Sequence, residues 1–407
     1  MAKIAIIGGG ASGMFCGICS ADGNNIVDIY EKNEKLGKKL YITGKGRCNL
    51  TNNCDISEFF ENINRNSEFL YSSLYGFTNF DLVSFFEKRG LKTKTERGNR
   101  VFPSTDKSSD VIKVLENILV KKRVNVKLNS EVKELKKMGM GFLLSSNAGK
   151  IYYDKVVVAT GGISYPKTGS TGFGYEIGEN FGHSIIKTVP VLVGINTKED
   201  YALSGVSLKN INLSLTNGNK ILWQEFRELL FTHGGLSGPV VLRTSVKIYD
   251  VKDRDLYLSI DLKPALTHDV LNKRILRDFQ KYSNKNIVNG LKDLLIQSLI
   301  PVILKISNIP EETKVNQITS VQRRELVNKI KNFKFTFKSL RSINEAVITR
   351  GGINVKEINP YTMESKICKN LFFIGEVLDV DANTGGFNLQ IAFSTAYAAG
   401  RSLCKNE

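Results

Sequence analysis

The feature that most constrains the fold is a glycine-spaced segment within residues 3–31. Residues 3–7 predict a buried strand, and an apolar helix is expected from about Ser12 to Ala21. A second predicted strand then ends on Glu31. Between the first strand and the helix, the spacing G-x-G-x-x-G is formed by Gly8, Gly10 and Gly13. This combination predicts a Rossmann-like dinucleotide-binding unit.

Each residue of this fingerprint has a physical task. Gly8 permits the tight turn, Gly10 lets the backbone approach a pyrophosphate, and Gly13 lets the helix pack closely on the strand. The helix N-terminus presents free N–H groups and partial positive charge to the pyrophosphate. Glu31 is expected to accept hydrogen bonds from the adenosine ribose and to disfavour a 2′-phosphate there.

The C-terminal segment favours FAD over NAD as the dinucleotide. Residues 370–403 predict a strand that ends at Gly375-Glu376, a glycine-rich loop, and a long helix that begins near Asn388. Such a returning element places a carboxylate on the ribityl chain and points a helix N-terminus at the flavin C2 carbonyl and N1. An ordinary strand, loop and helix without a ligand is the alternative.

Residues 150–162 predict one strand that runs into Thr160-Gly161-Gly162 near the adenine end of the cofactor. Neither the glycines that follow it nor residues 190–343 carry a second G-x-G-x-x-G after a strand. The sequence therefore predicts no second domain for a nicotinamide cofactor. Any NAD(P)H would dock transiently as a reductant.

The stretch GKGRCNLTNN, residues 44–53, permits three interpretations. Cys48 and Cys54 could be half of a metal site, but no second pair and no nearby histidine completes it. Cys48 could be a nucleophile or a proton donor. Alternatively, the glycines let the backbone approach a cofactor, and Arg47, Asn49 and Asn52 donate to its polar atoms. We expect a cofactor cradle, without metal, in which Cys48 is a thiol next to the flavin.

Net charge separates two regions of the chain. The 407 residues carry a formal charge of +17, and residues 190–343 hold 24 Lys and Arg against 14 Asp and Glu, a net +10. This surplus indicates a polyanionic or acidic partner, or only a lysine-rich proteome. The six cysteines show no disulfide spacing, and neither a signal peptide nor a membrane span is apparent, so a cytoplasmic location is expected, with no membrane partner.

The middle of the chain departs from the α/β pattern. Short alternating runs predict an antiparallel, barrel-like β domain in residues 190–266 and 332–343, and residues 267–331 predict a small helical domain. Residues 1–189 and 344–407 form the predicted Rossmann-like FAD-binding domain. The expected fold class is thus α/β with two inserted parts. The sequence does not indicate an oligomeric state.

Five segments in order resemble one family: GKKLYITGKGRCNLTN, RVFPSTDKSSDV, FTHGGLSGPVVLRTS, GGINVKEINPYTMESK and GEVLDVDANTGGFNLQIAFS. They are similar to the BaiN-like/YhiN-like flavoproteins, also called the aminoacetone oxidase family, over essentially the whole chain. The resemblance implies non-covalent FAD and redox chemistry. It departs at Phe173, where the family has an acid, and at Arg350, where a small residue is usual and where the arginine is expected to add a cation near the cofactor.

Together, the motifs and the resemblance predict the cofactor-binding residues. These are Gly8, Gly10, Ala11, Ser12, Gly13, Glu31, Lys32, Lys39, Gly44, Gly46, Arg47, Cys48, Asn49, Thr51, Asn52, Val132, Thr160, Gly161, Gly162, Gly375, Glu376, Asp379, Gly385, Gly386, Phe387, Asn388 and Leu389. The candidate catalytic residues are Cys48 and His233, the latter as an acid or base at the flavin.

The resemblance implies several activities: oxidation of aminoacetone, reduction of a C=C bond in bile-acid intermediates, and reduction of uracil in ribosomal RNA to dihydrouridine. The leading hypothesis is an FAD-dependent oxidoreductase that moves a hydride between flavin N5 and an organic substrate. The basic middle region favours uracil in ribosomal RNA as that substrate. The alternatives are a small-molecule oxidase or reductase, and a non-catalytic flavin-bearing module that binds RNA.

Overall fold

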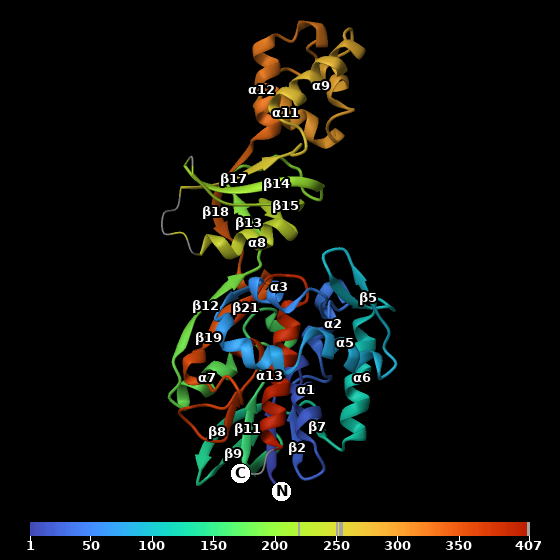
Figure 1. Ribbon diagram of the computed structural model, residues 1–407. Coiled ribbons are helices and arrows are strands. Elements are labelled where there is room, and N and C mark those ends of the chain that lie inside the picture. Colours follow the sequence, from blue (N-terminus) through green and yellow to red (C-terminus); the bar gives the residue numbers. More distant parts are fainter. Residues whose placement is uncertain (219, 250, 252–254, 405–407) are drawn as a thin grey trace. The chain divides into compact units, whose positions relative to one another are not determined.

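The computed structural model describes residues 1–218, 220–249, 251 and 255–404, and the chain forms two compact units. The first unit combines Met1–Val191 with Ile343–Glu407, and the second is Leu192–Ser342 (Figure 1). The second unit is thus an insertion between two halves of the first.

A parallel five-stranded sheet organises the first unit. Its order is β20 (Leu371–Phe373), β11 (Lys155–Val158), β1 (Lys3–Ile7), β2 (Ile26–Tyr30) and β7 (Asn125–Lys127). The central strands are buried on both faces, and this explains their continuous apolar sequence. Sequence order and spatial order differ, because β11 and β20 return from far along the chain to pair beside β1.

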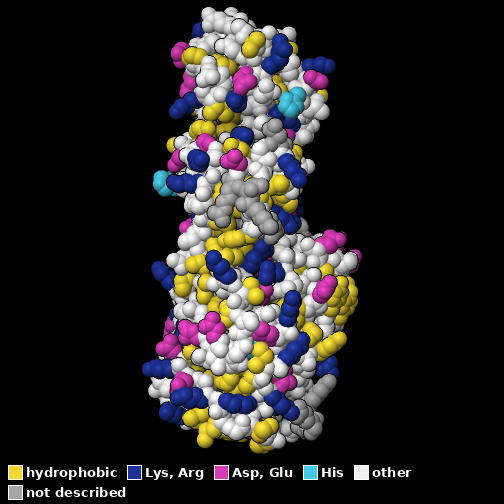
Figure 2. All heavy atoms as spheres, turned by 90° about the vertical axis from the view of Figure 1, so that its left-hand side faces the viewer, with side chains coloured by type: hydrophobic (Ala, Val, Ile, Leu, Met, Phe, Trp, Pro, Cys, Tyr) yellow, Lys and Arg dark blue, Asp and Glu magenta, His cyan; other side chains and the backbone are white. Residues whose placement is uncertain are grey.

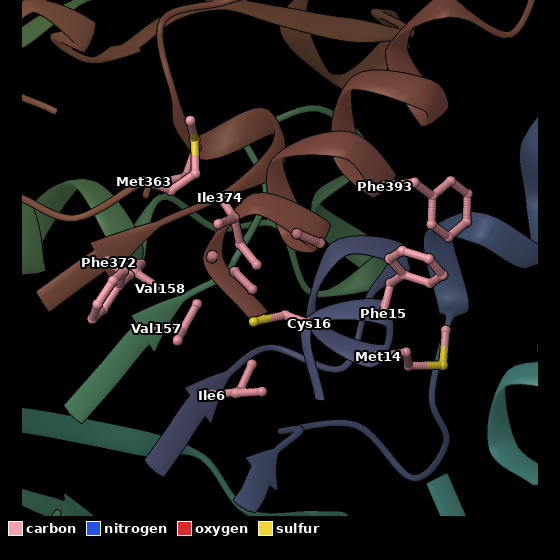
Figure 3. Close-up of a cluster of buried hydrophobic side chains, with 14 of the residues drawn as sticks. Ile6, Met14, Phe15, Cys16, Val157, Val158, Met363, Phe372, Ile374 and Phe393 are labelled. Carbon is pink, nitrogen blue, oxygen red and sulfur yellow. The ribbon is translucent and has the colours of Figure 1, made fainter. Parts of the chain in front are cut away.

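Two helices pack side by side next to this sheet: α1 (Ala11–Ser20) and α13 (Phe387–Leu403). Phe15 of α1 and Phe393 of α13 meet with ring centroids 5.2 Å apart, and Ile6 and Val157 of the strands belong to the same buried cluster (Figure 3). An added Cβ at Gly400 would lie 2.3 Å from Cys19 Cβ, so a glycine is required at this contact between α13 and α1.

Smaller sheets and helices surround this core. The sheets are β8 (Val132–Met138) with β9 (Gly141–Ser146) and β10 (Gly149–Tyr153); β3 (Thr51–Asn52) with β6 (Arg100–Pro103) and β5 (Thr93–Glu96); β12 (Ile185–Val191) with β19 (Ile348–Ile353); and β4 (Ile63–Arg65) with β21 (Asp381–Ala382). The further helices are α2 (Lys38–Ile42), α3 (Ile56–Glu61), α4 (Tyr71–Gly76), α5 (Asn79–Glu87), α6 (Ser108–Lys121) and α7 (Phe173–Asn180).

The prediction of a single strand over residues 150–162 is wrong. The segment forms two strands in different sheets, β10 and β11, which separate at Asp154. The Asp154 carboxylate accepts from Lys3 N (2.7 Å), and Asp154 N donates to Lys3 O (2.9 Å). These two hydrogen bonds hold Asp154 beside Lys3, the first residue of β1, where the chain enters the parallel sheet.

A closed six-stranded barrel forms the core of the second unit, together with helix α8 (Pro239–Ile248). The barrel order is β13 (Ile195–Thr197), β16 (Gly235–Ser237), β15 (Lys220–Thr232), β14 (Ser207–Asn217), β17 (Leu256–Asp261) and β18 (Phe333–Leu340). Phe333 and Phe335 of β18 point into the barrel core, whereas Lys334 is exposed, as the alternation predicts.

Four helices lie between β17 and β18: α9 (His268–Lys281), α10 (Ile287–Leu291), α11 (Ile300–Ile306) and α12 (Ser320–Lys331). Their apolar residues belong to the same hydrophobic cluster as the barrel interior, for example Leu271 and Leu326 with Leu258. The predicted fold class, an α/β Rossmann-like fold with an added β barrel and helices, is confirmed. The assignment of the helices to a domain of their own stays a prediction.

A buried histidine links three segments of the first unit. His183 Nε2 lies 2.8 Å from Ser365 Oγ, and His183 Nδ1 lies 3.2 Å from Glu357 Oε2. Burial lowers the pKa of His183 and the Glu357 carboxylate opposes this, with a net lowering. In the unfolded chain its pKa is about 6.5, so the unfolded state binds the proton first as the pH falls.

We therefore expect the stability of the first unit to be retained above about pH 6.5 and to fall as the pH drops below it. His183→Gln should cost about 1–2 kcal/mol at pH 7.5 and should reduce the loss of stability between pH 7.5 and 5.5. Urea unfolding of the wild type and H183Q at pH 7.5 and 5.5 measures the free energy of unfolding at each pH. The exposed histidine at position 268 offers a matched control, H268Q. An unchanged pH dependence in H183Q would contradict the assignment.

Candidate functional site

Four predicted groups meet at one edge of the parallel sheet. Gly8 follows β1, Glu31 follows β2, Thr160 follows β11, and Gly375 follows β20. Because parallel strands end at a common edge, these residues of distant sequence lie on the same side of the first unit. This edge is the usual ligand-binding position of open α/β sheets.

The glycine loop is shaped as the fingerprint requires. Gly8 adopts φ +107°, and its N–H donates to Tyr30 O (2.8 Å). A Cβ on Gly13 would lie 1.9 Å from Gly8 O, whereas a Cβ on Gly10 would meet nothing within 4 Å. Gly10 precedes α1, and no side chain caps that helix, whose first turn contains Ala11 and Ser12. Open space thus lies directly before an uncapped helix N-terminus.

The acid after β2 is held against the same loop. Glu31 is buried, and its carboxylate accepts from Gly9 N (2.9 Å), Asn33 N (2.9 Å) and Asn33 Nδ2 (2.6 Å). Lys32 beside it donates to Thr171 Oγ1 (3.1 Å). The predicted Val132 is the buried first residue of β8. The carboxylate is therefore oriented by the backbone of the glycine loop.

A second uncapped helix N-terminus begins at α13. Gly385 and Gly386 adopt φ +132° and +101°, and a Cβ on Gly386 would lie 2.3 Å from the Thr51 backbone. No side chain caps α13, and its first residues are Phe387, Asn388 and Leu389. The Asn388 amide instead binds Ala382, donating to its carbonyl (2.8 Å) and accepting from its N–H (2.9 Å).

The structure brings the GKGRCNLTNN stretch against this second helix. The Asn49 amide is placed to accept from Gly386 N (3.1 Å) while donating to Thr51 O (3.1 Å). Thr51 Oγ1 donates to Gln390 Oε1 (2.8 Å). Asn52 Nδ2 donates to Gly385 O (3.0 Å). Two segments more than three hundred residues apart therefore form one loop assembly around the start of α13.

Cys48 is buried within this assembly. Its side chain is fully buried, its backbone adopts φ +58°, and its N–H donates to Thr43 O (3.0 Å). Burial raises the pKa of the Cys48 thiol to about 12, with a smaller opposing effect from the Thr43 hydrogen bond, so the thiol stays protonated. Gly44 and Gly46 also adopt positive φ values. No group of three metal-ligating side chains occurs among the described residues.

Arg47 does not point freely toward a ligand. Its guanidinium pairs with Glu96 and with Asp106 (2.5 Å), and it stacks over the Phe102 ring with 4.2 Å to the centroid. The two carboxylates raise the pKa of Arg47. A structural role in holding the loop accounts for these contacts, and donation to the cofactor stays a prediction.

The carboxylate after β20 has three partners. Glu376 accepts from Lys39 Nζ (2.6 Å), Ser164 Oγ (3.0 Å) and Thr349 N (3.0 Å). Lys39 also donates to Ser164 Oγ (2.7 Å). Lys39 and Glu376 are among the predicted residues, whereas Ser164 and Thr349 are not. A serine hydroxyl and a backbone N–H leave no signal in the sequence of which carboxylate they contact.

Two further residues singled out by the sequence, Asp379 and Arg350, form arginine–carboxylate pairs. Asp379 accepts from Arg65 Nε at 2.7 and 2.8 Å. Arg350, which was expected to add a cation near the cofactor, forms a buried pair with Asp381 at 2.9 and 3.0 Å. Phe173 begins α7 and packs, half buried, against the hydrophobic core.

Two buried hydroxyls near this edge have no hydrogen-bond partner among the described atoms: Thr160 Oγ1 and Tyr175 OH. A buried polar atom without a partner is uncommon in a folded protein, and a bound ligand is one explanation. Gly161 adopts φ +72°, and Gly162 lies so close to Thr349 that a Cβ would be 2.5 Å from its hydroxyl. The open space at Gly10 and the orphaned Thr160 fit a bound dinucleotide.

His233 belongs to the second unit. It lies exposed on the turn between β15 and β16, and its carbonyl accepts from Arg341 (2.9 Å). Cys48 and His233, the two candidate catalytic residues, therefore belong to different units.

Comparison with known proteins identifies close relatives of the whole chain. The HI0933-like protein Rossmann domain family matches residues 2–402. A Clostridium scindens protein named 3-dehydro-bile acid delta(4,6)-reductase is 30% identical, covering 100% of both chains. Two proteins named ribosomal RNA dihydrouridine synthase also match, from Haemophilus influenzae (30% identical, 98% of each chain) and Escherichia coli (31%, covering 98% of this chain and 97% of that protein).

Solved structures share the fold at low sequence identity. The 3-ketosteroid-delta4-(5alpha)-dehydrogenase from Rhodococcus jostii RHA1 has a TM-score of 0.53 and 14% identity, covering 100% of this chain and 97% of that enzyme. The 3-ketosteroid delta1-dehydrogenase from Sterolibacterium denitrificans has a TM-score of 0.52 and 12% identity, covering 99% and 100%. These likenesses extend over both units of the chain.

Proposed function

The chain belongs to the HI0933-like Rossmann family and is an FAD-dependent oxidoreductase, and we propose that it reduces a uracil ring in ribosomal RNA to dihydrouridine. The observation that supports the flavin chemistry of this proposal is that helices α1 and α13 of the first unit both begin at a glycine, without a side-chain cap from the N-cap residue. One suits a pyrophosphate and the other an electron-rich ring.

In this proposal FAD is bound without a covalent link. The N–H groups at Gly10 and Ala11 would bind the pyrophosphate, and Glu31 would accept from the adenosine ribose. The start of α13, with Gly386 and Asn388, would lie at the isoalloxazine. When bound, the flavin supplies a hydride from its reduced N5. NAD(P)H is proposed as a transient reductant that restores it.

Reduction of the uracil C=C bond requires a hydride at one ring carbon and a proton at the other. Cys48 is our first candidate for the proton, because it belongs to the loop assembly at the start of α13 and its thiol is protonated at neutral pH. His233 is the second candidate. The names of the two synthase relatives and the charge of +17 support an RNA substrate. On the face in Figure 2, Lys and Arg side chains occur over both units, with Asp and Glu among them.

Loss of the Cys48 thiol should leave the flavin in place and slow product formation. We expect Cys48→Ala to lower turnover by about 10²–10⁴-fold, the usual contribution of a general acid. The flavin absorbance per protein should remain unchanged. Cys54→Ala, at a second buried thiol nearby in the sequence, is the matched control and should turn over normally. Wild-type turnover in C48A would remove Cys48 from the reaction.

The substrate itself is tested by mass spectrometry of ribosomal RNA nucleosides from cells with and without the gene. Dihydrouridine should be lost with the gene and restored by it. In parallel, the anaerobically reduced enzyme should be reoxidised by the RNA. Reoxidation by an enone of the bile-acid type instead, or electron transfer from aminoacetone to the oxidised flavin, would favour the small-molecule alternatives. A flavin that cannot be reduced or reoxidised, together with salt-sensitive RNA binding, would favour the non-catalytic module.

A further inference from the structure

A basic hairpin adjoins the loop assembly of the first unit. Strands β5 and β6 are joined by the turn Arg97-Gly98-Asn99, and Arg100 is the first residue of β6. Residues 92–107 contain five Lys and Arg against two Asp and Glu, a net charge of +3. Lys45 and Arg47 of the neighbouring loop add two further cations.

Backbone and amide hydrogen bonds fix the hairpin turn against the cofactor-site loop. Asn53 N donates to Asn99 O (2.7 Å), and Leu50 N donates to Val101 O (2.9 Å). Asn52 Nδ2 donates both to Gly98 O in the turn and to Gly385 O before α13, each at 3.0 Å. One side-chain amide therefore bridges the basic turn and the loop that begins α13. A ligand group at the turn would lie next to the proposed flavin end of the site.

The cations of this region divide into two classes. Arg47 and Lys94 are paired with Glu96 and Asp106. Arg97 and Arg100, by contrast, form no ion pair with any described residue, although Arg100 lies opposite Glu96 in the β5–β6 pair and contributes to lowering the pKa of Glu96. Both arginines are exposed, as is Lys45.

The side of the turn that Arg100 occupies is also defined. Its guanidinium lies 5.8 Å from the centroid of Phe102, the ring that Arg47 covers. Arg100 Nε donates to Arg97 O (3.0 Å), which holds its side chain at the turn. Arg97 and Arg100 thus flank the tip of one hairpin, and hydrogen bonds from Leu50, Asn52 and Asn53 attach this hairpin to the loop assembly.

We propose that Arg97 and Arg100 form an anion clamp that binds a phosphate group of the substrate beside the cofactor site. Guanidinium groups bind phosphate oxygens through two parallel hydrogen bonds. An arginine without an ion pair can do so without breaking a contact to a carboxylate. This inference rests on the proposed function and adds to it the element that positions the substrate. The phosphate is that of an RNA backbone or of a free nucleotide.

The first experiment measures RNA binding by the holoenzyme. The anisotropy of a fluorescein-labelled, uridine-containing single-stranded RNA is followed over a series of salt concentrations. Because each phosphate contact on a single strand contributes about 0.7 to the slope of log K against log salt, R97A/R100A should lower the slope by about 1.4. The control K133A/K150A removes two exposed lysines from β8 and β10, and its slope should match the wild type. Equal slopes for R97A/R100A and wild type would overturn the clamp on RNA.

The second experiment separates the source of the phosphate. Uridine monophosphate and uridine are titrated against the wild type and both double variants by calorimetry. Monophosphate binding that is weakened in R97A/R100A, with uridine binding unchanged, assigns the clamp to a free nucleotide if the RNA slope is unaffected. If neither ligand distinguishes R97A/R100A from the control, the clamp is wrong for both sources.

Two further measurements distinguish a loss of phosphate binding from a loss of folding or of flavin. The flavin content and thermal midpoint of R97A/R100A should equal those of the wild type, because both side chains are exposed. If either quantity changes, R97K/R100K is measured instead, because it preserves the charge. The clamp and the proposed function also fail separately. If the wild type forms no dihydrouridine but R97A/R100A still shows a smaller salt slope than the wild type, the clamp is supported and uracil reduction is contradicted. If the wild type forms dihydrouridine and R97A/R100A has the wild-type salt slope and wild-type nucleotide binding, uracil reduction is supported and the clamp is contradicted.

Discussion

Arg350→Met is expected to destabilise the first unit by about 3–5 kcal/mol, the usual result of removing one partner from a buried ion pair. The Asp381 side chain is fully buried and the Arg350 side chain is 9% exposed. Among the described residues, the partner that the Asp381 carboxylate would keep in the variant is Asn64 Nδ2, at 3.2 Å. A buried carboxylate without its cation either loses hydration energy or takes up a proton, and both outcomes cost stability.

Urea unfolding, followed by a probe in the first unit, measures the effect. The double variant R350M/D381L should recover most of the loss, because two apolar side chains leave no uncompensated charge. Arg227→Met removes an exposed arginine from Glu225 in the second unit, and it should cost less than about 1 kcal/mol because Glu225 keeps its pair with Arg243. A loss in R350M no larger than that in R227M would show that the buried pair contributes little.

Gly10→Ala and Gly13→Ala should separate cofactor binding from folding. A Cβ on Gly10 meets no protein atom within 4 Å, and the backbone there has φ −77°, so the apoprotein should fold normally. The added methyl group would occupy the proposed pyrophosphate position, and we expect FAD affinity to fall at least about tenfold, or 1.4 kcal/mol. A Cβ on Gly13 would lie 1.9 Å from a backbone oxygen and should destabilise the apoprotein by about 1–3 kcal/mol or more.

Flavin fluorescence titration of the apoprotein and thermal unfolding without FAD give the two readouts. Gly76→Ala is the control, since a Cβ there also meets nothing within 4 Å and the position has no predicted cofactor role. The expected pattern is normal stability with weak FAD binding for G10A. Unchanged FAD affinity in G10A would place the pyrophosphate elsewhere.

The local parts of the site could be predicted because short segments carry them. The strand, turn and helix around Gly8, Gly10 and Gly13 lie within one continuous stretch, and each glycine has its own steric reason. The barrel alternation at Phe333 and Phe335 is likewise a local period of two. The division of residues 150–162 into two strands was missed, because it depends on Asp154 reaching Lys3, and no local period records that contact.

By itself, the sequence determined the fold class, the dinucleotide fingerprint and the residues expected around it, because these depend on backbone sterics and on periodic burial. Only the tertiary structure decided how the side chains are used. It paired Arg350 with Asp381, directed Arg47 to Glu96 and Asp106, and joined Asn52 to both Gly98 and Gly385. Such pairings join segments far apart in the chain, and which charges meet depends on the packing of whole elements, which no short stretch of residues specifies.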